Sequence, residues 1–201
     1  MTATHAPLFG LVLAGGASRR MGEDKAALRY HGRTQLDWAC ERLGRRCEKV
    51  FVSMRRGQAG DELRRRHPAI YDEHEDIGPI AGIAAAQATH PAHAWLVVAC
   101  DLPFLTDTSP AALVASRDGR PVIAYRSAHD GLPEPLCAIY EPASRVAILE
   151  FIASGRHCPR KFVLGSGVEL LEQPEPAALD NINTPAELER ARRLLGSTSA
   201  Q

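Results

Sequence analysis

The sequence lacks the features that mark several large classes of protein. Nowhere does it contain about 18 consecutive apolar residues, and Met1 to Pro7 show no basic segment followed by an apolar run, so neither a membrane span nor a secretory signal is predicted. Lysine and arginine together number 24, as do aspartate and glutamate, so no net charge directs the chain to nucleic acid or to an anionic membrane. We therefore expect a soluble, cytoplasmic protein whose charges act locally.

Cysteine is present but not in a pattern that would staple the fold or hold zinc. The number of cysteines is odd and no C-x-x-C occurs among them, which argues against a disulfide framework and against a zinc site. The five residues are Cys40, Cys47, Cys100, Cys137 and Cys158. They are interpreted as reduced thiols, and only Cys158, between a histidine and a proline, is a candidate for reactivity. The eight histidines show no spacing typical of metal ligands.

Two common nucleotide-binding motifs are also missing around the N-terminal glycines. A Walker A motif needs a lysine directly after its last glycine, but Gly22 is separated from Lys25 by two acidic residues. A dinucleotide fingerprint needs spaced glycines, whereas Gly15 and Gly16 are adjacent. Neither a P-loop nor a dinucleotide-binding turn is therefore predicted.

What the N-terminus does contain is a strand followed by a basic, glycine-containing loop. The apolar run Phe9 to Ala14 predicts a short buried strand, and the two glycines after it leave backbone N–H groups open to a ligand. Positive charge follows at Arg19, Arg20 and Lys25. Such a loop can cradle an anion, and a phosphate chain is the expected ligand. An ordinary turn with a solvated basic face is the alternative.

Strands alternate with helices along most of the chain. We predict strands over 9–14, 50–53, 69–71, 95–100, 121–125 and 136–140, with a further short one around 168–171, and helices over 35–47, 61–67, 78–88, 143–154 and 184–195. Gly155 to Arg160 is expected to be a basic loop. A capping box at Thr184 and Glu187, with proline between them, starts the last helix.

This alternation predicts an α/β fold. We expect a single-domain three-layer sandwich over 1–195, Rossmann-like, with a mostly parallel sheet and helices on both faces, and a disordered tail over 196–201. Parallel strands place their C-terminal ends at one edge of the sheet. The loop at Gly15, together with Asp72 and Asp101, should therefore line one crevice.

Asp101 directly follows the most apolar predicted strand. A carboxylate at the edge of the crevice suits a magnesium ion, although a cap or turn residue before Leu102-Pro103 is the alternative. Nucleotidyl transfer needs positive charge at the α-phosphate, which magnesium, a lysine and backbone N–H groups supply together. We expect Lys25 and Asp101 to be the central pair of such a site.

Two glycines lie about one turn apart at the start of the helix predicted over 78–88. Gly78 and Gly82 would let a ligand approach the helix backbone, or they would allow tight packing of the helix on the sheet. The sequence leaves both interpretations open.

Four motifs in order make the chain resemble the molybdenum cofactor guanylyltransferases and related nucleotidyltransferases. They are Leu13-Ala14-Gly15-Gly16 through Lys25, Gly78-Pro79-Ile80-Ala81-Gly82, Cys100-Asp101-Leu102-Pro103 and Asn181-Ile182-Asn183-Thr184-Pro185. The family transfers a nucleoside monophosphate to the phosphate of molybdopterin, uses Mg²⁺ and releases pyrophosphate. The resemblance covers nearly the whole chain.

The resemblance implies a role for each matching residue. Catalysis would rest on Lys25, Asp101 and Arg20, and Asp101 would hold the metal. The nucleotide, GTP, would contact Leu13, Ala14, Gly15, Gly16, Lys25, Ser53, Asp72 and Asp101. The molybdopterin acceptor would contact Gly78, Gly82, Asn181 and Asn183. Transient contacts with enzymes that make or receive the cofactor are also implied.

Two positions depart from the family pattern. Ser53 stands where an asparagine is more usual, and Glu134 adds a carboxylate on the acceptor side. Transfer from CTP to the same pterin and transfer to another small phosphorylated acceptor are therefore kept as alternatives. A molybdopterin-binding delivery protein without catalysis is the non-enzymatic alternative.

The two asparagines of the last motif are two residues apart. In an extended segment Asn181 and Asn183 would face the same side, so both amides could point into the crevice. Asparagines before a helix also often bond their own backbone, which is the structural alternative.

Overall fold

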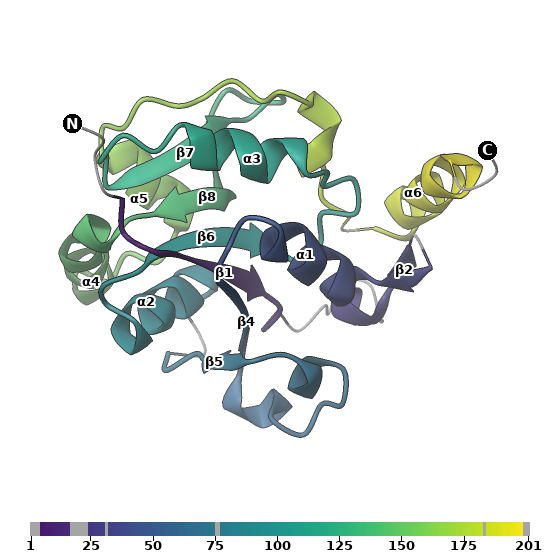
Figure 1. Cartoon of the computed structure of the whole chain (residues 1–201), viewed down its shortest axis with the longest axis horizontal. Helices are drawn as coiled ribbons and strands as arrows, with labels where there is room; N and C mark the ends of the chain where they lie inside the picture. The colour runs from purple at the N-terminus through teal and green to yellow at the C-terminus, as the bar shows by residue number, and fades with distance from the viewer. Residues whose placement is uncertain (1–4, 17–23, 31, 75–76, 183, 199–201) are drawn as a thin grey trace.

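The computed structural model describes residues 5–16, 24–30, 32–74, 77–182 and 184–198. Its centre is a six-stranded sheet in the order β5-β4-β1-β6-β8-β7 (Figure 1). The strands are β1 (Leu8–Leu13), β4 (Lys49–Met54), β5 (Ala69–Tyr71), β6 (Ala94–Ala99), β7 (Val122–Arg126) and β8 (Pro133–Tyr140). The first four are parallel to one another, and β8 runs antiparallel to both β6 and β7. The predicted mostly parallel sheet is confirmed.

Helices cover both faces of this sheet, which confirms the three-layer sandwich. They are α1 (Gln35–Gly44), α2 (Pro79–Thr89), α3 (Thr108–Ala115), α4 (Arg145–Ala153) and α5 (Pro159–Gly165), and a further helix is α6 (Pro185–Thr198). Alternate strand residues point to opposite faces. Thus Val12 packs in one core with α1 and α3, while Leu11 packs in the other with α2, α4 and α5.

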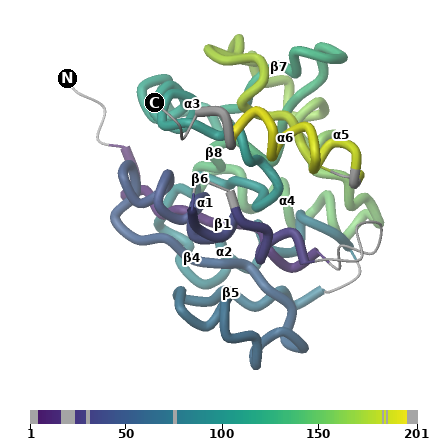
Figure 2. The backbone as a smooth tube through the Cα atoms, turned by 90° about the vertical axis from the view of Figure 1, so that its right-hand side faces the viewer, coloured from purple at the N-terminus to yellow at the C-terminus, as the bar shows by residue number. Residues whose placement is uncertain are grey.

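Helix α6 lies outside these layers. In Figure 1 the arrows of β1 and β6 point toward the side of the molecule where α6 lies, and Figure 2 looks onto that side. A small separate core of Leu28, Ile182, Leu188 and Ala191 joins α6 to the segment before it and to the start of the hairpin β2 (Arg29–Tyr30) and β3 (Arg33–Thr34). The C-terminal helix thus borders the edge at which the parallel strands end.

The register of the parallel strands brings their C-terminal ends together. Leu13 of β1 is paired with Ser53 of β4 on one side and with Ala99 of β6 on the other. The Ala14 N–H donates to the Ser53 carbonyl at 3.0 Å, which continues the ladder beyond β1. Backbone pairing therefore fixes where the glycine loop begins.

Several predicted elements differ from the structure. The helix expected over 61–67 is only a 3-10 turn, Arg64–Arg66, because Pro68 prevents the chain from continuing as a helix. The strand expected at 168–171 is a single bridge from Leu171 to Tyr125.

The loop expected over 155–160 ends early, since Pro159 opens α5. The last helix continues to Thr198, three residues beyond its expected end and into the segment predicted as a disordered tail. Its capping box is confirmed: the Thr184 N–H donates to the Glu187 carboxylate at 3.0 Å, and the Glu187 N–H donates to Thr184 Oγ1 at 3.3 Å. All five cysteines are free, as expected. Among the described helices, none is long and apolar enough to cross a membrane.

Candidate functional site

A cavity of about 260 Å³ opens at the C-terminal edge of the parallel strands. It is lined by Leu13, Ala14, Gly15, Gly16, Asp24, Lys25, Ser53, Arg55, Asp72, Gly78, Pro79, Ala99, Cys100, Asp101 and Leu136. We call it the loop cavity. Every residue predicted to contact the nucleotide lies on its wall, so the sequence prediction of a shared crevice is confirmed. The role of each residue in binding stays a prediction.

The chemical centre of the loop cavity is an ion pair between two motifs far apart in the sequence. Lys25 Nζ lies 2.9 Å from Asp101 Oδ2, and the two side chains are 16% and 22% exposed. Asp101 lies two residues beyond the end of β6, after Cys100, while Lys25 opens a 3-10 turn, Lys25–Ala27, in which Asp24 caps the Ala26 N–H. The pair therefore places one cation and one carboxylate, both partly desolvated, beside the glycine loop.

A second polar pair lies on the neighbouring strands. The Ser53 hydroxyl donates to Asp72 Oδ1 at 2.6 Å, which joins the ends of β4 and β5. A Cβ on Gly15 would lie 3.1 Å from Asp72 Oδ2, so the absence of a side chain lets the loop pass close to this carboxylate. Ser53, which departs from the family pattern, thus uses its hydroxyl hydrogen in a bond to Asp72.

The two glycines at the start of α2 have different surroundings. Gly78 has φ of +76°, is exposed, and lines the loop cavity at the N-terminus of α2. Gly82 is buried, and a Cβ there would clash with Ser53 Oγ and lie 2.9 Å from Leu13 Cδ2. The structure therefore explains Gly82 by packing of the helix on the sheet, and its contact with the acceptor stays a prediction.

The thiol of Cys100, which lines the loop cavity, is not available as a nucleophile. Cys100 is buried beneath Asp101, and this burial raises the pKa of its thiol to about 12. The thiol stays protonated near neutral pH, so it offers no thiolate for attack. The described walls of the cavity thus supply charge and hydrogen bonds rather than a covalent nucleophile.

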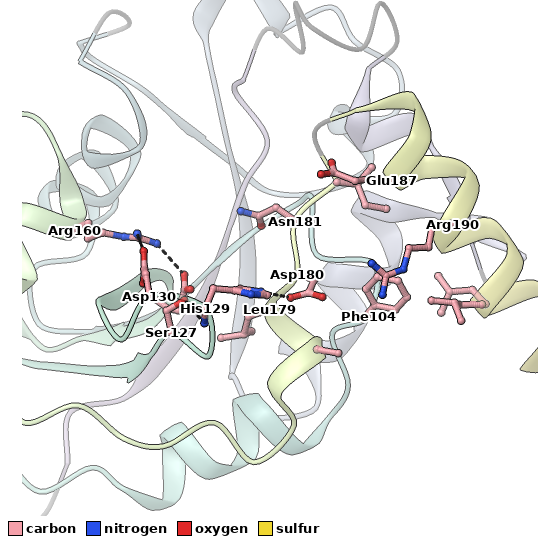
Figure 3. Close-up of a pocket in the computed structure, with 15 residues that line it drawn as sticks. Phe104, Ser127, His129, Asp130, Arg160, Leu179, Asp180, Asn181, Glu187 and Arg190 are labelled. Carbon is pink, nitrogen blue, oxygen red and sulfur yellow. Dashed lines mark hydrogen bonds and ion pairs between the residues drawn. The ribbon is translucent and has the colours of Figure 1, made fainter.

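A larger cavity of about 640 Å³ lies between the β7–β8 turn and α6 (Figure 3). It is lined by Phe104, Ser127, His129, Asp130, Glu134, Arg160, Ala177, Leu179, Asp180, Asn181, Ile182, Glu187, Arg190, Leu194 and Leu195. We call it the helix cavity. Of the predicted acceptor residues it contains Asn181.

Ion pairs cross the wall of the helix cavity. Arg160 Nη1 lies 2.8 Å from Asp130 Oδ2, and Arg160 Nη2 lies 3.6 Å from Glu134. His129 Nε2 lies 2.7 Å from Asp180 Oδ1 (Figure 3). The hydrogen bond and the charge of Asp180 raise the pKa of His129. These residues come from the β7–β8 turn, the start of β8, α5 and the segment before α6, and no short motif in the sequence connects them.

A third cavity of about 160 Å³ shares wall residues with both of the others, and we call it the connecting cavity. It shares Ala99 and Leu136 with the loop cavity, and it shares Glu134, Arg160, Leu179 and Asn181 with the helix cavity. The Ile182 N–H also donates to the Asp101 carbonyl at 3.3 Å. The segment that carries Asn181 is therefore attached to the residue predicted to hold the metal. Arg20 and Asn183 lie outside the described residues.

The described residues of the loop cavity suit a magnesium ion that shares its coordination with a phosphorylated substrate. Within the described ranges, no group of three or more histidine, cysteine or acidic side chains is placed to hold a metal. Magnesium commonly takes one or two carboxylates from a protein and completes its coordination with phosphate oxygens and water. Asp101, partly exposed at the cavity wall, suits that arrangement.

Comparison with known proteins assigns the chain to a family. The model of the MobA-like NTP transferase domain matches residues 10–170. The chain belongs to this family. As a MobA-like transferase domain it is a nucleotidyltransferase, and the loop cavity lies within the matched residues.

Relatives with similar sequences bear names from molybdenum cofactor synthesis. A molybdenum cofactor guanylyltransferase of Cereibacter sphaeroides is 32% identical over 195 residues, covering 94% of this chain and 97% of that protein. A molybdenum cofactor biosynthesis bifunctional protein of Synechocystis is 35% identical over 183 residues, covering 90% of this chain and 53% of that protein. The chain thus spans about half the length of the Synechocystis relative.

Solved structures share the MobA-like fold. The molybdopterin-guanine dinucleotide biosynthesis protein A of Archaeoglobus fulgidus superposes with a TM-score of 0.76 at 24% identity, covering 94% of this chain and 99% of that one. A nucleotidyl transferase from Methanothermobacter superposes with a TM-score of 0.77 at 18% identity, covering 96% and 99%. At these identities the likeness concerns the fold.

Proposed function

We propose that this nucleotidyltransferase transfers GMP from GTP to the phosphate of molybdopterin, with Mg²⁺, and releases pyrophosphate. The observation that carries the proposal is that the loop cavity and the helix cavity each share wall residues with the connecting cavity. The loop cavity holds the Lys25–Asp101 pair beside the glycines, and the connecting cavity leads from it to Asn181 and Arg160. A donor nucleotide and a separate acceptor could thus meet at one place.

In this proposal the loop cavity binds the triphosphate. Backbone N–H groups at Gly15 and Gly16 and the N-terminus of α2 at Gly78 offer partial positive charge to phosphate oxygens. Lys25 adds a full charge, and Asp101 would hold the magnesium ion that neutralises charge on the triphosphate. Ser53 and Asp72 would face the nucleoside.

The transfer itself exchanges one bond to phosphorus for another. An oxygen of the acceptor phosphate forms a bond to the α-phosphorus of GTP, and the bond from that phosphorus to the oxygen bridging it to the β-phosphate breaks. The electron pair of the broken bond leaves with pyrophosphate. Catalysis then consists of positioning and of stabilising negative charge, which the residues of the loop cavity can supply without a covalent intermediate.

The helix cavity is the proposed acceptor site. Its volume of about 640 Å³ falls in the range of pockets that enclose small organic ligands. Asn181 offers both donors and acceptors to a pterin, and Arg160 offers a guanidinium to a phosphate. Contacts with enzymes that supply molybdopterin or receive the product would follow from this activity.

Pyrophosphate release tests the proposal and its alternatives together. The purified protein would be assayed with Mg²⁺ and molybdopterin against GTP, CTP, ATP and UTP separately. We expect release with GTP and only when acceptor is present. Preference for CTP would give the cytidylyl alternative, and release only with another phosphorylated acceptor would replace molybdopterin. Binding of molybdopterin without any release would support a delivery protein.

An Asp101→Asn variant tests whether Asp101 binds the metal. The amide keeps the shape of the side chain and removes its charge, so half-maximal activity should need more Mg²⁺ than in the wild-type protein. An unchanged magnesium titration would assign Asp101 a structural role.

A further inference from the structure

One arginine of the 3-10 turn Arg64–Arg66, which lies between β4 and β5, is buried while its neighbours are exposed. Arg64 is 2% exposed and is among the largest fully buried side chains, whereas Arg65 and Arg66 beside it are exposed. A buried guanidinium is costly to desolvate unless it is fully paired. Arg64 is therefore expected to be paired with several acceptor groups of the protein.

The guanidinium of Arg64 contacts the chain on both sides of the glycine loop. Its Nε and Nη2 donate to the Ala14 carbonyl at 3.1 and 2.9 Å. Its Nη1 and Nη2 donate to the two carboxylate oxygens of Asp24 at 2.7 and 3.0 Å. Ala14 is the residue before the glycine pair, and Asp24 is the residue before Lys25. One side chain thus ties the start of the loop to its end.

The charges of these groups support one another. Burial by itself lowers the pKa of Arg64, but hydrogen bonds and the charges of Asp24 and Asp61 outweigh it and raise that pKa. Burial by itself raises the pKa of Asp24, but Arg64 and the Ala26 N–H outweigh it and lower that pKa. Arg64 and Asp24 are therefore both ionised at neutral pH.

Asp24 passes this constraint on to the catalytic pair. Its Oδ1 accepts from the Ala26 N–H at 3.1 Å and so caps the turn that begins at Lys25. The Lys25 ammonium then reaches Asp101 at 2.9 Å. The contacts run without a break from β1, through Arg64 and Asp24, to the pair at the centre of the loop cavity.

We propose that Arg64 is a positioning residue for nucleotidyl transfer: by holding Ala14 and Asp24 together it sets the place of Lys25 against Asp101 and the bound triphosphate. This inference rests on the proposed function of the loop cavity. Arg64 does not line that cavity, so it acts through Asp24 and not on the substrate. A planar fork is needed, because only such a group serves a carbonyl and a bidentate carboxylate in fixed directions. A lysine in its place keeps the charge and loses the fork.

The test compares Arg64→Lys and Arg64→Met with Arg65→Met, an exposed arginine on the same turn. Displacing a catalytic group by about 1 Å costs on the order of 100-fold in rate, so Arg64→Met should lower kcat by about that factor and Arg64→Lys by roughly 10-fold. Arg65→Met should match the wild type. Equal kcat for wild type and Arg64→Lys, measured well below the melting temperature of each, would overturn the proposal.

An Asp24→Asn variant separates positioning from a general loss of stability. If Arg64 acts through Asp24, the fold-loss in kcat of the double variant Arg64→Lys, Asp24→Asn should equal that of the more damaged single variant. Multiplication of the two single losses would show that they act independently and would overturn the proposal. These variants retain most of the side chain volume, so they carry the test if Arg64→Met does not fold.

Hydrogen exchange tests the role of Arg64 without relying on transferase activity. The amide hydrogen of Ala26 is bonded to Asp24, so its exchange should be at least several-fold faster in Arg64→Lys than in Arg65→Met at equal global stability. Unchanged exchange would refute the positioning role even if the protein is an active transferase. A wild-type protein without any transferase activity, but with this change in exchange, would refute the proposed function and leave the link from Arg64 to Asp24 standing.

Discussion

The loop cavity and the helix cavity lie side by side but are held in different ways. The walls of the loop cavity are the ends of parallel strands, aligned by backbone pairing of Leu13 with Ser53 and Ala99. Buried Arg64 also ties Ala14 to Asp24, and two side-chain pairs, Lys25 with Asp101 and Ser53 with Asp72, join further parts of these walls. The walls of the helix cavity come from turns and from α6, and side-chain ion pairs join them.

The exposure of these pairs decides how much each contributes. Arg64 is 2% exposed, whereas His129 is 73% exposed in its pair with Asp180. An exposed ion pair is typically worth no more than about 1 kcal/mol and is screened by salt. The loop cavity is therefore preorganised by the fold, as stabilisation of a charged transition state requires. The walls of the helix cavity are joined by more exposed ion pairs, which hold them less firmly.

The largest effect is expected on the preorganised side. Lys25→Ala removes the ammonium from the loop cavity, and losing one such group typically lowers kcat by about 100- to 1000-fold. Steady-state pyrophosphate release measures it. Lys161→Ala, an exposed lysine on α5, is the control and should leave kcat unchanged. A Lys25→Ala protein with near-normal kcat would show that the cavity does not depend on its central charge.

Packing beneath the loop cavity gives the next largest effect. In Gly82→Ala the new methyl group would clash with Ser53 Oγ, which is held by Asp72. Overpacking of this kind costs about 1–3 kcal/mol, while alanine in a helix gains up to about 1 kcal/mol over glycine. The cost of overpacking should exceed the gain in helix propensity, so denaturant titration should show a lower free energy of unfolding.

Gly165→Ala is the matched control for this substitution. A Cβ there meets nothing within 4 Å, so the helical gain should stand alone and stability should hold or rise. If Gly82→Ala also stabilised the protein, the contact between α2 and the sheet would be looser than the structure has it.

A smaller and more selective effect is expected in the helix cavity. Asn181→Ala removes one amide from a wall shared with the connecting cavity. A single hydrogen bond contributes about 0.5–1.5 kcal/mol, so the KM for the acceptor should rise up to roughly 10-fold while the KM for the nucleotide and the melting temperature stay constant. Loss of stability with an unchanged acceptor KM would make Asn181 a structural residue.

The parallel half of the fold was predictable because each of its strands contains a run of apolar residues. Such runs occur where both faces of a strand are buried, as in β6, where every residue is buried. Helix α3 was missed since Pro110 lies in its first turn and only eight residues form it. The hairpin of β2 and β3 has two residues in each strand, and tertiary contacts rather than local pattern hold it.

The candidate site divides in the same way. The loop cavity could be predicted because its residues follow strands directly or lie in compact motifs. The helix cavity could not, because His129, Arg160 and Asp180 stand far apart in the sequence and meet only through the tertiary fold. Arg64 was hidden within a run of three arginines, where nothing local distinguishes the buried one from its exposed neighbours.

The smallest expected effects concern pH, and they have opposite signs in the two cavities. The folded-state pKa of Asp24 is lowered, with the pairing to Arg64 outweighing burial. The ionised Asp24 carboxylate therefore stabilises the folded protein above the unfolded-state pKa, about 4, and this contribution is lost as the pH falls through the folded-state pKa. The pKa of His129 is raised by Asp180. Its stabilisation is present below the unfolded-state pKa, about 6.5, and is lost as the pH rises through the folded-state pKa.

Two variants isolate these contributions, because every other titrating group cancels in the difference from wild type. The loss of unfolding free energy in Asp24→Asn should be constant near neutral pH and shrink below about pH 4. The loss in His129→Gln should be greatest below about pH 6 and shrink above about pH 7. Denaturant midpoints measured across this range give both curves. Curves that shrank in the same direction would contradict the contrast drawn between the two cavities. The expected curves would assign the change near neutral pH to the pair of His129 and Asp180 in the helix cavity, and the change in acid to the pair of Asp24 and Arg64 beside the loop cavity.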